Sequence, residues 1–199
     1  DEQHRFGVAQ RAKLLSKGDN PHLLVMSATP IPRTLGLIIF GDLDISVIDE
    51  LPPNRKPVRT VLLPVSGRGR IYKFIREEVS RGRQAYIVCP SVEGSDEMKS
   101  AVDFCNELQR TVFRGISIAC LHGRMKSEEK EAILSDFIKN KISVLVSTTV
   151  IEVGVNVPNA SLMIVENADR FGLSQLHQLR GRVGRGSRKA YCVLVSDAR

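Results

Sequence analysis

Short apolar segments alternate with amphipathic ones along most of the chain. The amphipathic segments carry apolar side chains at helical spacing, each set forming one stripe of the kind that covers a sheet. This alternation predicts an α/β fold with a parallel sheet flanked by helices. The predicted strands are "HLLVMS", "VRTVLLPV", "QAYIVCP", "GISIACL", "ISVLVST", "ASLMIVE" and "AYCVLVS". The predicted stripes are Ile71, Phe74, Ile75 and Val79; Ala101, Cys105, Leu108 and Val112; and Ile133, Leu134, Phe137 and Ile138.

One segment, "DELPPNRKP" over residues 49–57, interrupts this pattern with three prolines and mixed charge. Such a composition is typical of an extended linker. Residues 58–199 then have the length of an ordinary domain, whereas residues 1–48 are too few to bury their own apolar side chains. We therefore expect a complete domain over 58–199 and a remnant of another domain over 1–48.

Composition narrows the class of protein. The 199 residues carry a net charge of +7 and a pI near 9.5, which favours a polyanionic partner such as nucleic acid or nucleotide phosphate. The four cysteines show no C-x-x-C pairing and lie in apolar stretches, so they are predicted to be reduced packing residues of a cytoplasmic protein. No apolar run is long enough to span a membrane. The abrupt start on "DEQH" suggests a piece of a longer protein.

Two polar segments near the start could carry chemistry. In "DEQH", Asp1 and Glu2 are adjacent carboxylates, followed by His4. At a phosphate site one such carboxylate can hold Mg²⁺ while its neighbour orients the attacking water; an acidic surface turn is the alternative. In "SATPIPRT", Ser27 and Thr29 follow a predicted strand, and on their own they equally suit a helix cap.

Polar residues also follow two later strands. His122 and Gly123 come after "ISIAC", and "STTVIEVGVNVPNA" comes after "ISVLV". The carboxyl ends of parallel strands are where open α/β sheets bind ligands. Thr148 could donate to a phosphate, and Gly154 would let a ligand approach the backbone. The alternatives are an ordinary loop histidine and a glycine turn.

The segment "QLRGRVGRG", residues 178–186, places arginines among glycines just before an apolar strand. Arginine does not lose its charge, so arginines beside a buried strand need either anionic partners or solvent. The segment is therefore either an anion site or a solvated basic turn.

In this order, the segments DExH, S-A-T, T-x-x-x-x-x-G-x-N-x-P and Q-x-x-G-R-x-G-R resemble the later half of a superfamily 2 helicase motor. The longer strings "DEQHRFGV", "SATPIPRT", "LPPNRKP" and "ADRFGLSQLHQLRGRVGRG" are similar to bacterial RecG-type branched-DNA helicases, over essentially the whole chain. Transcription-repair coupling translocases share much of these strings and remain an alternative. The resemblance implies a RecA-like second motor lobe, preceded by an incomplete piece of the first lobe.

The resemblance also implies roles for the first-lobe residues. ATP and Mg²⁺ would bind in the cleft between two lobes. Asp1 would hold Mg²⁺, Glu2 would polarise the hydrolytic water, and His4 would couple this site to its neighbours. Ser27 and Thr29 would link the nucleotide state to movement of the lobes.

In the second lobe, the resemblance implies that Thr148, with His122 and Gly123, contacts the DNA. Gly154 and Asn156 would lie near the nucleotide, although many relatives have Asp in place of Asn156. The residues expected to face the ATP phosphates are Gln178, Arg182 and Arg185, and Gly181 and Gly184 complete their motif.

No G-x-x-x-x-G-K-[ST] phosphate loop occurs in the sequence. We therefore expect the chain to be inactive alone, but part of an ATP-dependent DNA helicase or translocase that remodels replication forks and Holliday junctions in recombination and repair. The alternative of another class is a basic nucleic-acid-binding module without catalysis. In that module the phosphate clamps would be Arg180, Arg182, Arg185 and Arg188.

Overall fold

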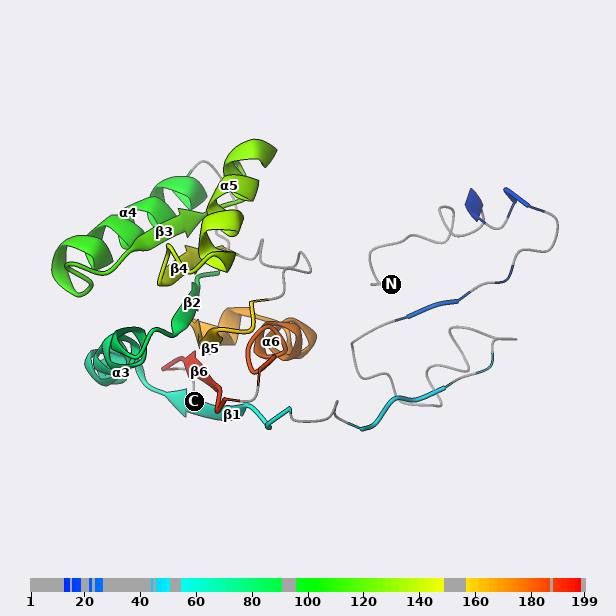
Figure 1. Ribbon diagram of the computed structural model, residues 1–199, viewed down its shortest axis with the longest axis horizontal. Coiled ribbons are helices and arrows are strands. Elements are labelled where there is room, and N and C mark those ends of the chain that lie inside the picture. Colours follow the sequence, from blue (N-terminus) through cyan, green and yellow to red (C-terminus); the bar gives the residue numbers. More distant parts are fainter. Residues whose placement is uncertain are drawn as a thin grey trace. The chain divides into compact units, whose positions relative to one another are not determined.

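The computed structural model describes residues 13–14, 16–18, 22, 24–26, 44, 46–50, 55–90, 96–148, 157–186 and 188–197. The chain divides into two compact units, Asp1–Asp49 and Glu50–Arg199. The sheet and the helices that position the candidate site all belong to the second unit (Figure 1).

Six strands form one sheet, and every neighbouring pair is parallel. Their spatial order is β1-β6-β5-β2-β4-β3. These strands match six of the seven predicted apolar segments, which confirms the predicted parallel α/β fold. They are β1 (Arg59–Leu63), β2 (Gln84–Val88), β3 (Ile118–Leu121), β4 (Val144–Ser147), β5 (Ala160–Val165) and β6 (Tyr191–Val195).

The prediction of a seventh strand over "HLLVMS" is wrong for those of its residues that the structure describes. Residues 22 and 24–26 have no regular secondary structure. A strand is held by hydrogen bonds to a neighbouring strand, and the described residues of the first unit provide no such neighbour.

The helices cover both faces of the sheet (Figure 1). Helices α3 (Arg68–Ser80) and α4 (Asp96–Thr111) pack on one face, and α5 (Ser127–Ile138) and α6 (Leu173–Arg180) pack on the other. Side chains of β2 alternate between the two cores, with Ile87 facing α3 and α4 and Tyr86 facing α5 and α6. The central strands β2, β4 and β5 are buried along their whole length, which explains why their sequences are nearly continuous apolar runs.

The cysteines behave as packing residues, as predicted. All four are free: Cys105 and Cys192 are buried, and Cys89 and Cys120 are partly buried.

Because the six strands are parallel, all of them end at one edge of the sheet and begin at the other. We call these the carboxyl edge and the amino edge.

Candidate functional site

The structure places the predicted site residues at both edges of the sheet. His122, Gly123 and Thr148 lie at the carboxyl edge, because they directly follow β3 and β4. The segment that carries Gln178, Arg182 and Arg185 leads from the end of α6 to the start of β6. The predicted residues that lie outside the described part of the chain are Asp1, Glu2, His4, Ser27, Thr29, Gly154 and Asn156.

Four residues that follow neighbouring strands line the carboxyl edge. The Thr148 N–H donates to the Leu121 carbonyl, with 3.2 Å between the nitrogen and the oxygen, so Thr148 and His122 are neighbours. Two similar hydrogen bonds connect the next strands of the sheet. The Cys89 N–H donates to the Ser147 carbonyl and the Glu166 N–H donates to the Val88 carbonyl, each at 2.8 Å. The resulting order, with steps of about 5 Å between strands, is His122, Thr148, Cys89 and Glu166, and we call this set the carboxyl row.

Three members of the carboxyl row bury a polar atom that has no hydrogen-bond partner among the described residues. These atoms are His122 Nδ1, Thr148 Oγ1 and Glu166 Oε1, and the three residues are 7%, 1% and 2% exposed. A buried polar atom without a partner costs about 1–3 kcal/mol. The Thr148 hydroxyl and a His122 ring N–H are groups that donate to phosphate oxygens, whereas the Glu166 carboxylate oxygen only accepts.

The charges beside the row are paired. Arg68 donates to Glu166 Oε2 from Nη2 at 2.7 Å and from Nε at 3.1 Å, and this hydrogen bonding raises the pKa of Arg68. Burial, reinforced by the charge of Glu166, raises the pKa of the Cys89 thiol to about 12. Burial likewise raises the pKa of Tyr72 to about 12. Cys89 is therefore a neutral thiol near neutral pH, unsuited to act as a nucleophile.

Sequence reasoning missed Glu166 and Arg68. Glu166 directly follows the apolar strand "ASLMIV", so the strand-end rule that selected His122 and Thr148 could have selected it as well. Arg68 carries no such signal, because its contact depends on how α3 packs beside β5.

The arginine loop, residues 181–186, is shaped by two glycines and a valine. α6 ends where the Gly181 N–H donates to the His177 carbonyl at 3.0 Å. Val183 is fully buried in the core beneath α6 and anchors the loop. Gly184 then adopts a φ of +73°, a backbone conformation that residues other than glycine rarely adopt.

The arginine loop lies at the amino edge. A Cβ on Gly184 would lie 2.8 Å from Val58 Cγ2, and a Cβ on Gly186 would lie 3.1 Å from the Pro158 carbonyl oxygen. Val58 precedes β1 and Pro158 precedes β5. The structure thus brings His122, Gly123 and Thr148 together and separates them from Arg182 and Arg185, with the sheet in between.

Three arginines interact at the amino edge. Burial, together with the positive charges of Arg182 and Arg55, lowers the pKa of Arg185. The Arg185 Nε donates to the Gly181 carbonyl at 3.2 Å. Arginines remain protonated despite such mutual repulsion, so the cluster suits an anion that carries several charges. Gln178, one turn before the loop on α6, is partly exposed.

The described residues contain neither a membrane-spanning helix nor a cluster of metal ligands. None of the helices they form is both long and apolar enough to cross a membrane. They also contain no group of three or more His, Cys, Asp or Glu side chains placed to bind a metal ion. The residue predicted to hold Mg²⁺, Asp1, lies outside them.

Comparison with known families identifies the second unit. Residues 69–187 match the helicase conserved C-terminal domain, a stretch that runs from α3 through the arginine loop. The chain belongs to this helicase C-terminal domain family. Both edges described above, the carboxyl row and the arginine loop, lie inside the matched stretch.

Individual relatives extend the match beyond the helicase C-terminal domain. The chain is 57% identical over its full length to the ATP-dependent DNA helicase RecG of Synechocystis sp., and 54% identical over 98% of its length to that of Thermotoga maritima. A structure of RecG bound to a three-way DNA junction covers the whole chain at 50% identity, with a TM-score of 0.79. The resemblance to RecG-type helicases and the RecA-like fold are therefore confirmed. The chain spans about a quarter of the length of these relatives, 24% and 25%.

Proposed function

We propose that the chain serves as the second motor lobe of a longer, cytoplasmic ATP-dependent DNA helicase of the RecG type. Residues 58–199 form this lobe, residues 49–57 link it to the first lobe, and residues 1–48 are the end of the first lobe. The family match and the identity to RecG relatives about four times longer support this assignment. The 199 residues by themselves are proposed to be inactive, because they contain no phosphate loop.

The amino edge is proposed to face ATP. The observation that carries this is the cluster of Arg55, Arg182 and Arg185, in which burial first, and then the charges of Arg182 and Arg55, lower the pKa of Arg185. Such a cluster fits the several negative charges of a triphosphate. Arg182 and Arg185 stabilise the charge that develops on the γ-phosphate during hydrolysis, and Gln178 faces the phosphates beside them.

The remaining nucleotide contacts are proposed from the resemblance. Asp1 holds Mg²⁺, Glu2 polarises the hydrolytic water, and His4 couples this site to its neighbours. Asn156 lies near the ribose, Gly154 lets the nucleotide come close to the backbone, and Ser27 and Thr29 link the nucleotide state to movement of the lobes. Bound Mg²⁺ neutralises part of the phosphate charge.

The carboxyl edge is proposed to face DNA. Thr148 and His122 lie at this edge without hydrogen-bond partners for Oγ1 and Nδ1 among the described residues. Hydroxyl and imidazole groups donate to backbone phosphates, and exposed Gly123 lets the strand approach. Branched DNA is the proposed substrate, because the RecG structure that is similar to this chain holds a three-way junction. A replication fork or a Holliday junction presents the same kind of branch.

The test is made in the full-length helicase that contains this chain. Arg185→Ala should lower kcat for ATP at saturating DNA by about 10³-fold or more, with DNA affinity and its salt dependence kept. Arg110→Ala, which removes an exposed arginine from the last turn of α4, is the matched control and should change neither quantity.

A basic nucleic-acid-binding module predicts the reverse. If Arg185 clamps a DNA phosphate, Arg185→Ala should flatten the slope of log affinity against log salt by about 0.7 to 0.9. Turnover at saturating DNA would then stay near normal. That result would replace the proposed ATP site with a phosphate clamp.

A further inference from the structure

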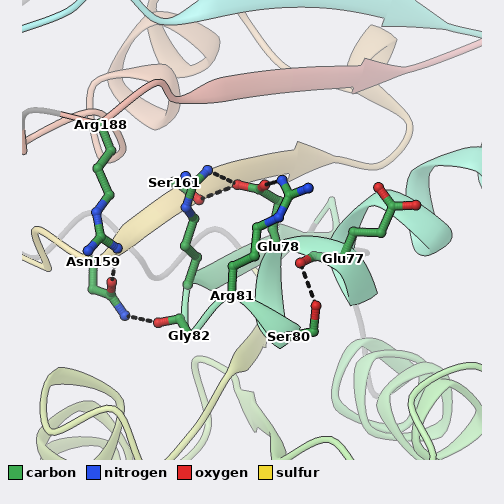
Figure 2. Close-up of polar contacts among 9 residues, drawn as sticks. Glu77, Glu78, Ser80, Arg81, Gly82, Asn159, Ser161 and Arg188 are labelled. Carbon is green, nitrogen blue, oxygen red and sulfur yellow. Dashed lines mark hydrogen bonds and ion pairs between the residues drawn. The ribbon is translucent and has the colours of Figure 1, made fainter.

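Asn159 joins several segments of the amino edge. It lies in the turn just before β5, and Figure 2 shows its side chain between Gly82 and Arg188. Its Nδ2 donates one hydrogen to the Gly82 carbonyl at 2.8 Å, and its second hydrogen is shared between Asn140 Oδ1 at 3.2 Å and Gln84 Oε1 at 3.3 Å. One amide thus contacts the turn before β2, the start of β2 and the turn before β4.

Gln84 determines which way this amide points. The Gln84 side chain is fully buried, and its Nε2 donates to the carbonyls of Phe137 at 2.5 Å and Ile142 at 2.7 Å. Only Gln84 Oε1 is left to face Asn159, and an acceptor there requires a donor. The Asn159 nitrogen therefore turns toward Gln84, and its oxygen is left to face the other way.

That oxygen meets the segment that follows the arginine loop. Arg188 Nη1 donates to Asn159 Oδ1 at 3.4 Å, as Figure 2 shows. The adjacent residue, Pro158, packs so closely on Gly186 that a Cβ there would lie 3.1 Å from its carbonyl oxygen. Val183 and Gly184 hold the middle of the arginine loop against the core. Its last residue, Gly186, lies against Pro158, the neighbour of Asn159.

We infer that Asn159 is a positioning residue for ATP hydrolysis, acting through Arg188. By accepting the Arg188 hydrogen bond it fixes the far end of the arginine loop, and with it the placement of Arg182 and Arg185. This inference rests on the proposed function of the amino edge. Because arginines that stabilise a transition state act mainly on kcat, loosening the loop should lower kcat more than it changes the KM for ATP.

Removing either partner tests the link in the full-length helicase. Asn159→Ala and Arg188→Ala should each lower kcat at saturating DNA about tenfold, since misplacement by about 1 Å can cost up to about 100-fold. The KM for ATP should stay within about twofold. The double variant should be no slower than the slower single variant, because both substitutions break the same link.

A conservative variant separates positioning from folding. Asn159→Asp loses all three donated hydrogen bonds but keeps an acceptor for Arg188, so it should lower the thermal unfolding temperature at least as much as Asn159→Ala. Its kcat should nevertheless stay within about threefold of the parent, because the charge-assisted bond to Arg188 is stronger. A merely structural role for Asn159 predicts instead that kcat follows stability.

The matched control is Asn140→Gly. Asn140 has a φ of +60°, which glycine keeps without strain, and the change removes an Asn159 contact without touching Arg188. Its kcat should stay within about twofold of the parent. Independent, multiplying effects of Asn159→Ala and Arg188→Ala, or an unchanged kcat in Asn159→Ala, would overturn the inference.

These outcomes are distinct from failure of the proposed function. If Arg185→Ala loses turnover while Asn159→Ala keeps it, only the positioning role falls. If Arg185→Ala keeps normal turnover, the result contradicts the proposed ATP site at the amino edge, and with it the proposed role of Asn159.

Discussion

Arg68 and Glu166 form an ion pair in which both hydrogen bonds reach the same carboxylate oxygen. Arg68 Nη2 lies 2.7 Å and Nε 3.1 Å from Glu166 Oε2. The Glu166 side chain is 3% exposed, and that of Arg68 is 34% exposed. The pair thus joins the start of α3 to Glu166, the member of the carboxyl row that follows β5. A carboxylate buried to this degree depends on its partner for compensation of lost hydration.

Removing Arg68 should therefore destabilise the fold. Arg68→Ala leaves the Glu166 carboxylate buried without its donor, and the free energy of unfolding should fall by about 1–3 kcal/mol. Urea unfolding followed by circular dichroism measures this change. Adding Glu166→Gln to Arg68→Ala should recover part of the loss, because an amide is cheaper to bury than a charge.

The control for this pair is Lys141→Ala. Lys141 pairs with Asp136 at 3.0 Å, but the two side chains are 65% and 45% exposed. Exposed pairs contribute about 1 kcal/mol or less. An Arg68→Ala variant no less stable than Lys141→Ala would contradict the importance of the buried pair.

Tyr86 predicts how stability depends on alkaline pH. Burial raises its pKa to about 12 from the ordinary value of 10.0, and its ring packs on Phe137 with 4.9 Å between centroids. The folded state therefore holds the phenol proton more tightly than the unfolded state. The contribution of Tyr86 is complete below about pH 10 and is lost as the pH rises toward about 12, at up to about 1.4 kcal/mol per pH unit.

Tyr86→Phe provides the comparison, because it keeps the ring and removes the ionisable group. Unfolding free energies of the two proteins, measured from pH 9 to pH 12 in steps, should fall less steeply for the variant above about pH 10. Parallel curves over this whole range would show that Tyr86 does not hold its proton through burial.

Gly184 should be intolerant of a side chain. Its φ is +73°, and an added Cβ would lie 2.8 Å from Val58 Cγ2. Gly184→Ala should therefore lower the free energy of unfolding by about 1–3 kcal/mol. Gly69→Ala is the matched control, because Gly69 lies in α3 with nothing within 4 Å of the added Cβ. It should leave stability unchanged or raise it by up to about 1 kcal/mol; equal losses for both substitutions would contradict the account.

Much of the fold could be predicted because burial on both faces leaves a clear mark on the sequence. The central strands are continuous apolar runs, and Ile71 and Ile75 or Cys105 and Leu108 mark the buried stripes of α3 and α4. α6 was missed because its stripe is short and begins on Leu173, which is 86% exposed. The arginine loop that follows α6 was seen, but only as a short Arg/Gly segment.

The site could be predicted only in part. His122 and Thr148 follow from the rule for strand ends, whereas the contacts of Asn159 depend on strand order. β5 and β2 are neighbours in the sheet but lie far apart in sequence. The residues around Asn159 in the chain therefore do not indicate that it contacts Gly82 or Gln84. The pairing of Arg68 with Glu166 has the same cause. Sequence patterns locate strand ends, and the order of the strands decides which ends meet.

The carboxyl edge is proposed to bind DNA and the amino edge to act on ATP, and comparing one variant at each edge tests this division. In the full-length helicase, Thr148→Val and Arg185→Ala are each measured for DNA affinity and for kcat of ATP hydrolysis at saturating DNA. Thr148→Val, which removes the buried hydroxyl, should weaken DNA binding by about 1–3 kcal/mol and leave kcat at saturating DNA within about threefold. Arg185→Ala should keep DNA affinity and lose about 10³-fold or more in kcat. If both variants lose affinity and turnover in the same proportion, or if the two effects are exchanged, the division between the edges is wrong.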